Sequence, residues 1–196
     1  LRESERRFRR NLKSTRNVAA RLRWSFGVET MSTAPAEELI YEWLKANYPD
    51  GPVWFDEEMP ADQLPPLETR MLYAFNVIEY NISNGGWSQF LWNCLSNWRS
   101  ILDTAQAGYT LIGAVEQANA LSTLRSLCEQ DEQECIAALE REDGSMDTFA
   151  EFTRRSYGNN DNDWESLFWG DIYEKRTAWL NANEGRIRLL IGRIDA

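Results

Sequence analysis

Histidine is absent from this sequence of 196 residues. Its absence excludes sites in which an imidazole activates a serine or cysteine nucleophile, and it excludes zinc sites with histidine ligands. Paired helical carboxylates that bind two metal ions also require a Glu-x-x-His motif. Glu129, Glu132 and Cys135 are therefore interpreted as part of a solvated acidic face, and we expect no metal and no cofactor.

Cysteine is scarce, with Cys94, Cys128 and Cys135 as its only members. Three cysteines are too few for a disulfide framework. Cys128 and Cys135 are seven residues apart, about 10.5 Å along one helix, which is too far for a disulfide. We expect buried thiols in a reducing cytoplasm.

Long apolar runs are also missing. No stretch approaches the roughly eighteen consecutive apolar residues of a transmembrane helix, and no secretory signal is recognisable. The sequence therefore predicts a cytoplasmic protein without a membrane segment. Aromatic residues are plentiful instead, with nine Trp, seven Tyr and eight Phe, and they can supply much of one core.

Charge is unevenly distributed along the chain. Residues 1–30 carry a net charge of +6, and residues 31–196 carry −16, most of it in the segments 37–68 and 129–174. The acidic segments must face water or a partner. Residues 1–30 are predicted to be a basic N-terminal arm or a non-native leader, since Met31 resembles a natural start. The arm could also dock on the protein's own acidic surface. A nucleic-acid or membrane arm is disfavoured by the acidic body beside it. Residues 31–196 are predicted to form one acidic, all-helical domain.

The apolar spacing predicts helices throughout the domain. Apolar residues recur at steps of three and four over 67–82 and again over 87–98, and Asn84-Gly85-Gly86 separates the two runs. The sequence thus predicts an all-α domain centred on a helix-Asn-Gly-Gly-helix hairpin. Further helices are expected from Thr33 to about Tyr48, from Trp87 into the Leu102 region, over 114–128, over 129–142, over 146–157, from about Asp163 to Leu180, and at the C-terminus, the last as a packed helix or a dimer contact. A second joint is expected at Gly113-Ala114, and Trp54 and Phe55 are expected to pack on the core.

The acidic surface is the most prominent candidate for function. A net charge of −16 over 166 residues exceeds what solubility requires and adds self-repulsion. Carboxylates at helical spacing lie ~5–6 Å apart, which is comparable with the spacing of phosphates along a DNA strand, so the acids could imitate duplex DNA. The body has no basic patch with interleaved aromatics, so direct nucleic-acid binding is not expected. Asp161-Asn162-Asp163 lacks the glycine and the final glutamate of a calcium loop. The candidate partner-binding acids are Glu129, Asp131, Glu132, Glu134, Glu140, Glu142, Asp143, Asp147, Asp161 and Asp163.

Residues 84–93 resemble the signature of the DNA mimic protein 19 family, Asn-Gly-Gly-aromatic-x-Gln-aromatic-aromatic-x-Asn. The matching positions are Asn84, Gly85, Gly86, Trp87, Gln89, Phe90 and Asn93. Leu91 departs from the pattern, where the family often has a second Phe. Glu79, Ile112-Gly113-Ala114 and Asp171-Ile172-Tyr173 are also similar to that family, and the resemblance covers residues 35–183.

The resemblance implies an all-α homodimer without catalytic activity. It implies an acidic surface that imitates duplex DNA and binds a DNA-binding protein with a basic site, such as a helix-turn-helix transcription factor, and so regulates it in a bacterial cytoplasm. The residues alone leave an alternative open: an immunity or adaptor protein whose acidic face neutralises a basic toxin or partner without imitating DNA.

Overall fold

The computed structural model describes residues 35–48, 55, 64–141, 146–157, 163–169 and 172–194. Within these ranges the regular elements are helices and no strand occurs, which confirms the all-α fold class. The predicted arm at 1–30 and Trp54 lie outside the described residues, whereas Phe55 is buried as expected. In chain order the elements are α2 (Pro35–Asn47), α3 (Leu67–Cys94), α4 (Trp98–Leu111), α5 (Val115–Glu140), α6 (Met146–Tyr157), the 3-10 helix η2 (Asp163–Phe168), α7 (Ile172–Ala182) and α8 (Glu184–Ile194).

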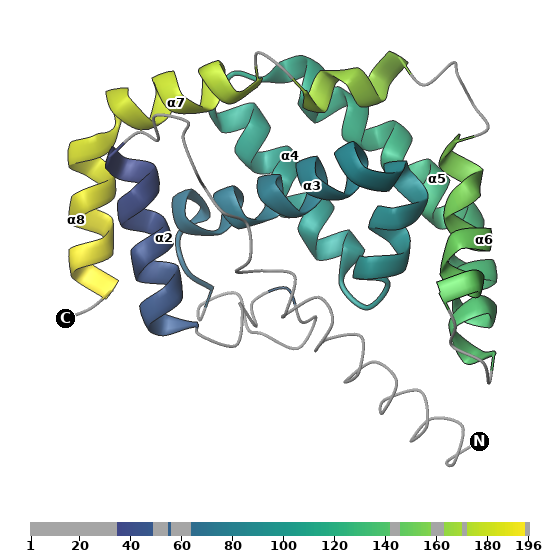
Figure 1. Ribbon diagram of the computed structural model, residues 1–196. Coiled ribbons are helices and arrows are strands. Elements are labelled where there is room, and N and C mark those ends of the chain that lie inside the picture. The colour runs from purple at the N-terminus through teal and green to yellow at the C-terminus, as the bar shows by residue number, and fades with distance from the viewer. Residues whose placement is uncertain are drawn as a thin grey trace.

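Helix α3 lies at the centre of the molecule (Figure 1). It contacts α2, α4, α5, α6 and η2. Its apolar side chains at steps of three and four, among them Phe75, Ile78 and Phe90, are completely buried. A helix that is covered on several sides needs apolar residues around most of its circumference, and the sequence of α3 meets that need.

The chain leaves helical geometry inside α3 at Gly86. Its φ of 71° and ψ of −167° form a combination that is open essentially only to glycine. Beyond the break, the side-chain amide of Asn93 donates a hydrogen bond to Oδ1 of Asn81 at 2.7 Å. On a straight helix these residues would be about 18 Å apart, so the chain turns sharply between them. The predicted break at Asn-Gly-Gly is confirmed.

Helix α4 approaches α3 closely because Gly108 has no side chain. A Cβ at Gly108 would stand 2.6 Å from Cβ of Met71 and 2.8 Å from Cζ of Phe75. The neighbouring Tyr109 is buried, and its ring stacks on that of Phe75 with the centroids 4.1 Å apart. The absence of a Cβ thus permits the aromatic stack that joins the two helices.

The prediction of one helix from Trp87 into the Leu102 region is wrong. A turn at residues 95–97 separates α3 from α4, and Asn97 has a non-helical φ of −149°. Cys94, Trp98 and Leu102 continue at steps of four across this turn, so the apolar spacing alone does not reveal it. Asn97 favours caps and turns because its side chain competes with the backbone for hydrogen bonds.

The second predicted joint, at Gly113-Ala114, is confirmed, since Gly113 has a φ of +76°. Helix α5 then continues without a break to Glu140, so the two helices expected over 114–128 and 129–142 are one. In its second half the buried stripe is narrow and consists of Cys128, Asp131, Cys135 and Ala138. Ile136 and Leu139 are only half-buried.

The single helix predicted from about Asp163 to Leu180 is wrong as well. The structure has two elements there, η2 and α7, and Phe168 and Ile172 are buried at their facing ends. The sequence between them contains Gly170, and glycine is the poorest helix former apart from proline. The helix predicted over 146–157 is confirmed as α6.

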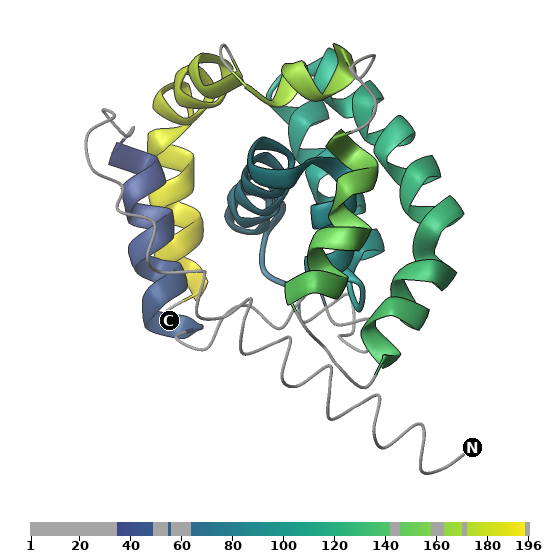
Figure 2. The same cartoon turned by 45° about the vertical axis from the view of Figure 1, so that its right-hand side comes forward.

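Helices α2 and α8 lie side by side on one flank of α3, and α5 and α6 lie on the other (Figures 1 and 2). Ile40 and Leu44 of α2 and Ile187 and Ile191 of α8 are buried. The helices that begin and end the described chain are therefore packing partners. The final apolar stretch forms the packed helix α8, which is the first of the two structures predicted for it.

A buried charge cluster joins α2 to the rest of the fold, and we define it as Glu37, Glu79 and Arg176. Nη1 of Arg176 in α7 lies 2.8 Å from Oε2 of Glu79 in α3, and its Nε lies 3.5 Å from Oε1 of Glu37 in α2. The hydroxyl of Tyr109 donates to Oε1 of Glu79 at 3.1 Å. One guanidinium therefore faces two carboxylates in the interior, and it links three helices.

Candidate protein-binding surface

The outer side of α5 is a surface on which acidic side chains are exposed to solvent. Glu116, Glu129, Glu134 and Glu140 are exposed on this helix. Glu129 and Glu140 form no ion pair with another described residue, and both lie on the same side of the helix, about 16 Å apart along its axis. Their carboxylates are thus available to a partner.

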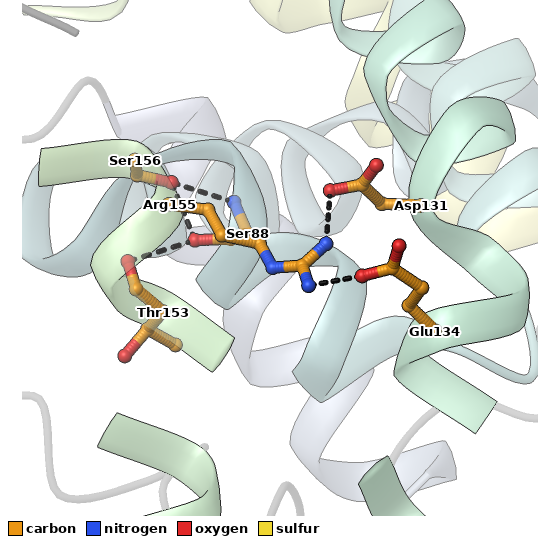
Figure 3. A network of polar contacts seen from close by, with 6 residues as sticks. All are labelled: Ser88, Asp131, Glu134, Thr153, Arg155 and Ser156. Carbon is orange, nitrogen blue, oxygen red and sulfur yellow. Dashed lines mark hydrogen bonds and ion pairs between the residues drawn. The ribbon is translucent and has the colours of Figure 1, made fainter. Parts of the chain in front are cut away.

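Two of the predicted acids are instead brought together by an arginine. Arg155 in the last turn of α6 donates from Nη1 to Oδ2 of Asp131 at 2.7 Å and from Nη2 to Glu134 (Figure 3). Asp131 is buried, whereas Glu134 is exposed. This fork of hydrogen bonds attaches α6 to α5 and neutralises part of the acidic charge there.

Glu132 contacts α4, whereas Asp131 and Glu134 contact α6, and it forms a bidentate pair. Arg99 donates from Nη1 and Nη2 to its two carboxylate oxygens at 2.6 and 2.8 Å, and the indole N–H of the buried Trp98 donates to Oε1 at 3.0 Å. The hydrogen bonds from Arg99 lower the pKa of Glu132, although partial burial opposes them. Glu132 therefore holds α4 on α5, and its charge is compensated within the chain.

The remaining predicted acids divide into two groups. Asp147 at the start of α6 and Asp163 at the start of η2 are exposed, and neither forms an ion pair with another described residue. Glu142, Asp143 and Asp161 lie outside the residues that the structure describes. Of the predicted set, Glu129, Glu140, Asp147 and Asp163 are thus the exposed carboxylates without an internal cation among the described residues.

The backbone amides that follow the Asn-Gly-Gly motif are hydrogen-bonded by side chains of the protein itself. After Gly86 the first amides of the second helical segment would be free to bind an anion. The N–H of Trp87 donates to Oε1 of Glu165 at 3.3 Å, and the N–H of Ser88 donates to Oγ of Ser156 at 2.9 Å (Figure 3). Burial raises the pKa of Glu165, and the hydrogen bond from Trp87 opposes this shift. The motif positions α6 and η2 against α3.

Most of the other signature residues also face the interior of the fold. Trp87 and Phe90 are buried. Nε2 of Gln89 donates to Oδ1 of Asn81 at 3.4 Å, alongside the bond from Asn93. Asn84 is exposed, and its Nδ2 donates to the carbonyl oxygen of Tyr80 at 2.8 Å. These contacts stabilise the bend of α3 at Gly86.

Arginine partners are what the sequence reasoning missed. Arg155 and Arg176 each bind two acids on other helices, and Arg99 binds both carboxylate oxygens of Glu132 on α5. None of the three was identified from the sequence as a partner of an acid. For Arg155 a weak signal existed, because it falls in the last turn of a predicted helix, where cations are favoured. For Arg176 the partners are far away in the chain.

These observations define a class: an all-helical acidic protein in which some carboxylates form internal ion pairs and others are exposed without a cation among the described residues. None of its described helices is long and apolar enough to cross a membrane. A family model described as DMP19-like protein matches residues 62–183, and the chain belongs to that family. No curated protein and no solved structure shows significant similarity to the chain.

Helices α2 and α8 lie outside the matched residues 62–183. The family model thus covers the central helix, the acidic helix α5 and most of the elements packed on them. The resemblance noted for the signature at 84–93 falls inside this match, so the family predicted from the sequence is confirmed.

Proposed function

We propose that the protein is a non-enzymatic DNA mimic. Its acidic surface occupies the basic site of a DNA-binding protein, such as a helix-turn-helix transcription factor, and thereby regulates it. The observation that carries the proposal is the pair of exposed carboxylates Glu129 and Glu140 on the outer side of α5, which form no ion pair with another described residue, in a chain of the DMP19-like family. Free anionic groups attract a basic site from a distance and raise the rate of association.

The internal ion pairs support this choice of surface. Asp131 and Glu132 are compensated by Arg155 and Arg99, so a partner would have to replace an existing bond to use them. Glu129 and Glu140 require no such exchange. Asp147 on α6 is equally free, and Glu142 and Asp143 continue the acidic stretch in the sequence.

The test uses a purified helix-turn-helix repressor encoded in the same genome, with its operator duplex as competitor. Binding of the full chain is measured by biolayer interferometry over a series of salt concentrations. We expect affinity to fall steeply with salt, operator DNA to displace the protein, and the double variant Glu129→Lys/Glu140→Lys to bind at least about tenfold more weakly.

The matched control is Glu38→Lys/Glu42→Lys on α2. Both residues are exposed, the change in net charge is the same, and α2 lies on the other flank of α3 (Figure 2). If this control weakens binding as much as the α5 variant does, net charge and not a defined surface is responsible. Equal affinity at low and high salt would rule out electrostatic mimicry.

The alternative is an immunity or adaptor protein that neutralises a basic partner at a site other than its DNA-binding site. In that case the acidic chain binds while operator DNA fails to compete. The proposal also includes a homodimer in a bacterial cytoplasm, for which sedimentation velocity is the measurement.

A further inference from the structure

The buried charge cluster has a net charge of −1 when its three groups are ionised. Glu37 and Glu79 contribute two carboxylates, and Arg176 contributes one guanidinium between them. Glu37 is 2% exposed and Arg176 is 5% exposed, so water screens the excess charge very little. An uncompensated charge is costly in the interior of a protein, and a buried carboxylate commonly avoids that cost by taking up a proton.

The two carboxyl groups of the cluster are hydrogen-bonded very unequally. Glu79 accepts at Oε2 from Nη1 of Arg176 at 2.8 Å and at Oε1 from the hydroxyl of Tyr109 at 3.1 Å. Oε1 of Glu37 lies 3.5 Å from Nε of Arg176 and 3.5 Å from the hydroxyl of Tyr41. Oε2 of Glu37 is buried and has no hydrogen-bond partner among the described residues. The unsatisfied carboxylate oxygen of the cluster therefore belongs to Glu37.

The other ionisable groups near Glu37 do not compensate its charge. Tyr41 on the same helix stays neutral, because burial raises its pKa. On α7 the ring of Tyr173 lies under the guanidinium of Arg176, with its centroid 5.0 Å from Cζ. Two arginines of α8, the helix beside α2, form ion pairs with other acids: Arg186 with Glu68 and Arg188 with Glu184.

We propose that the buried charge cluster is a proton-binding site, and that Oε2 of Glu37 is the atom that takes the proton from water. The bound proton brings the cluster to zero net charge. A buried hydroxyl without a partner costs much less than a buried charge without one. Because Glu37 belongs to α2, whereas Glu79 and Arg176 belong to α3 and α7, proton binding is coupled to the attachment of α2. This site is independent of the proposed function.

The pKa of Glu37 agrees in direction with the geometry. Burial has the largest effect and raises this pKa above its ordinary value of 4.5, Arg176 opposes the rise, and Glu79 adds to it. A raised pKa means that the folded protein holds the proton more tightly than the unfolded chain does. The stability that the proton contributes is therefore fully present below pH 4.5 and is lost as the pH rises through the folded-state pKa. At this cluster, acid strengthens the attachment of α2.

The direct test is an NMR titration of the full chain, with ¹³C in the glutamate side chains. The carboxyl signal of Glu37 is assigned by its absence in the variant Glu37→Gln. We expect this signal to titrate with a midpoint above 4.5. A midpoint at or below that value would show that Arg176 and the positive end of the α2 dipole outweigh burial, and it would overturn the proposal.

The second measurement is the urea midpoint of Glu37→Gln and of the wild type at a series of pH values. Glutamine is permanently neutral, so the stability of this variant relative to the wild type should rise as the pH rises from 4.5 to neutral. Each unit by which the pKa is raised corresponds to a tenfold change in the unfolding equilibrium constant. The pH dependence is the criterion, because any cost of fitting glutamine into the site is the same at every pH. A relative stability that falls with rising pH contradicts the proposal.

The matched control is Glu79→Gln, which removes the same charge from the same cluster. This variant loses the charge that accepts from Arg176 at 2.8 Å, so its urea midpoint at neutral pH should lie below that of the wild type. If Glu79→Gln instead raises the midpoint, the excess charge does not reside on Glu37, and the assignment of the proton to that residue is wrong.

Discussion

The buried charge cluster and the outer side of α5 use the same kind of residue in opposite ways. Glu37 and Glu79 are held in the interior around Arg176 and link α2, α3 and α7. Glu129 and Glu140 lie in water with no cation beside them among the described residues. The first pair specifies how helices meet, whereas the second pair links no two helices among the described residues.

The difference shows that the number of acids overstates the surface available to a partner. The chain has 31 Asp and Glu residues, yet several of them form internal ion pairs with arginines from other parts of the fold. Those acids are Glu37, Glu68, Glu79, Asp103, Asp131, Glu132, Glu134 and Glu151. The acids that form internal ion pairs must therefore be identified before the remaining acids are assigned to binding.

The largest effect is expected at the buried charge cluster. Arg176→Met removes the guanidinium that lies between Glu37 and Glu79, and it leaves two carboxylates in the interior without that cation. We expect the free energy of unfolding to fall by about 3–5 kcal/mol, measured by urea denaturation at neutral pH.

The triple variant Arg176→Met/Glu37→Gln/Glu79→Gln is the control. It removes all three charges, so it should recover much of the lost stability, because well-packed neutral groups often replace a buried ion network at little cost. A loss below about 1 kcal/mol in Arg176→Met would mean that the cluster behaves like a surface ion pair.

The next effect compares the two glycine joints. Gly86→Ala would force a Cβ into Ser156 and place alanine at a φ of 71°, so we expect a loss of about 2–4 kcal/mol. Gly113→Ala has a similar φ of 76° but no atom within 4 Å of the added Cβ, and strain alone should cost about 1–2 kcal/mol. Thermal unfolding of the two variants measures the difference, and equal losses would show that the contact with α6 contributes nothing.

A smaller effect with a defined pH dependence is expected at Glu132. Its pKa is lowered from the ordinary value of 4.5, so its contribution is fully present above pH 4.5 and is lost as the pH falls through the folded-state value. Glu132→Gln should cost about 1–2 kcal/mol at neutral pH, and the gap from the wild type should close in acid. Urea unfolding at a series of pH values measures it. A gap that widens as the pH falls would contradict this assignment.

The smallest effect is expected on the free acidic side. Glu129→Gln/Glu140→Gln should change the free energy of unfolding by no more than about 0.5 kcal/mol, as is usual for exposed positions away from special contacts. The same urea series measures it. A clear destabilisation would show that these residues stabilise the fold, as the buried charge cluster does, and it would weaken their assignment to a partner.

Most helices could be predicted from apolar spacing, because steps of three and four record which side is buried. The two joints at Gly86 and Gly113 were also predictable, since both need a positive φ. The turn at residues 95–97 was not, because the apolar spacing passes through it unchanged. The division between η2 and α7 was missed for the same reason.

The roles of the acids could not be predicted from their spacing. Whether an acid of α5 points outward depends on the phase of that helix relative to the core, so Asp131 is buried while Glu129 is exposed. Whether the charge of an acid is compensated depends on an arginine that the fold brings near it. Arg99 lies 33 residues from Glu132 in the sequence, and Arg176 lies 97 residues from Glu79. Such pairings follow from tertiary packing, and the resemblance to a family did not supply them.

The packing of α2 against α8 has a consequence for synthesis on the ribosome. Helix α2 leaves the exit tunnel early, but the chain that covers Ile40 and Leu44 is completed only at Ile194, about 150 residues later. At the usual rates of translation this delay lasts roughly 7–30 seconds. During that time the apolar face of α2 that packs on α8 has no partner helix. The contact between α2 and α8 therefore forms only after α8 has left the ribosome.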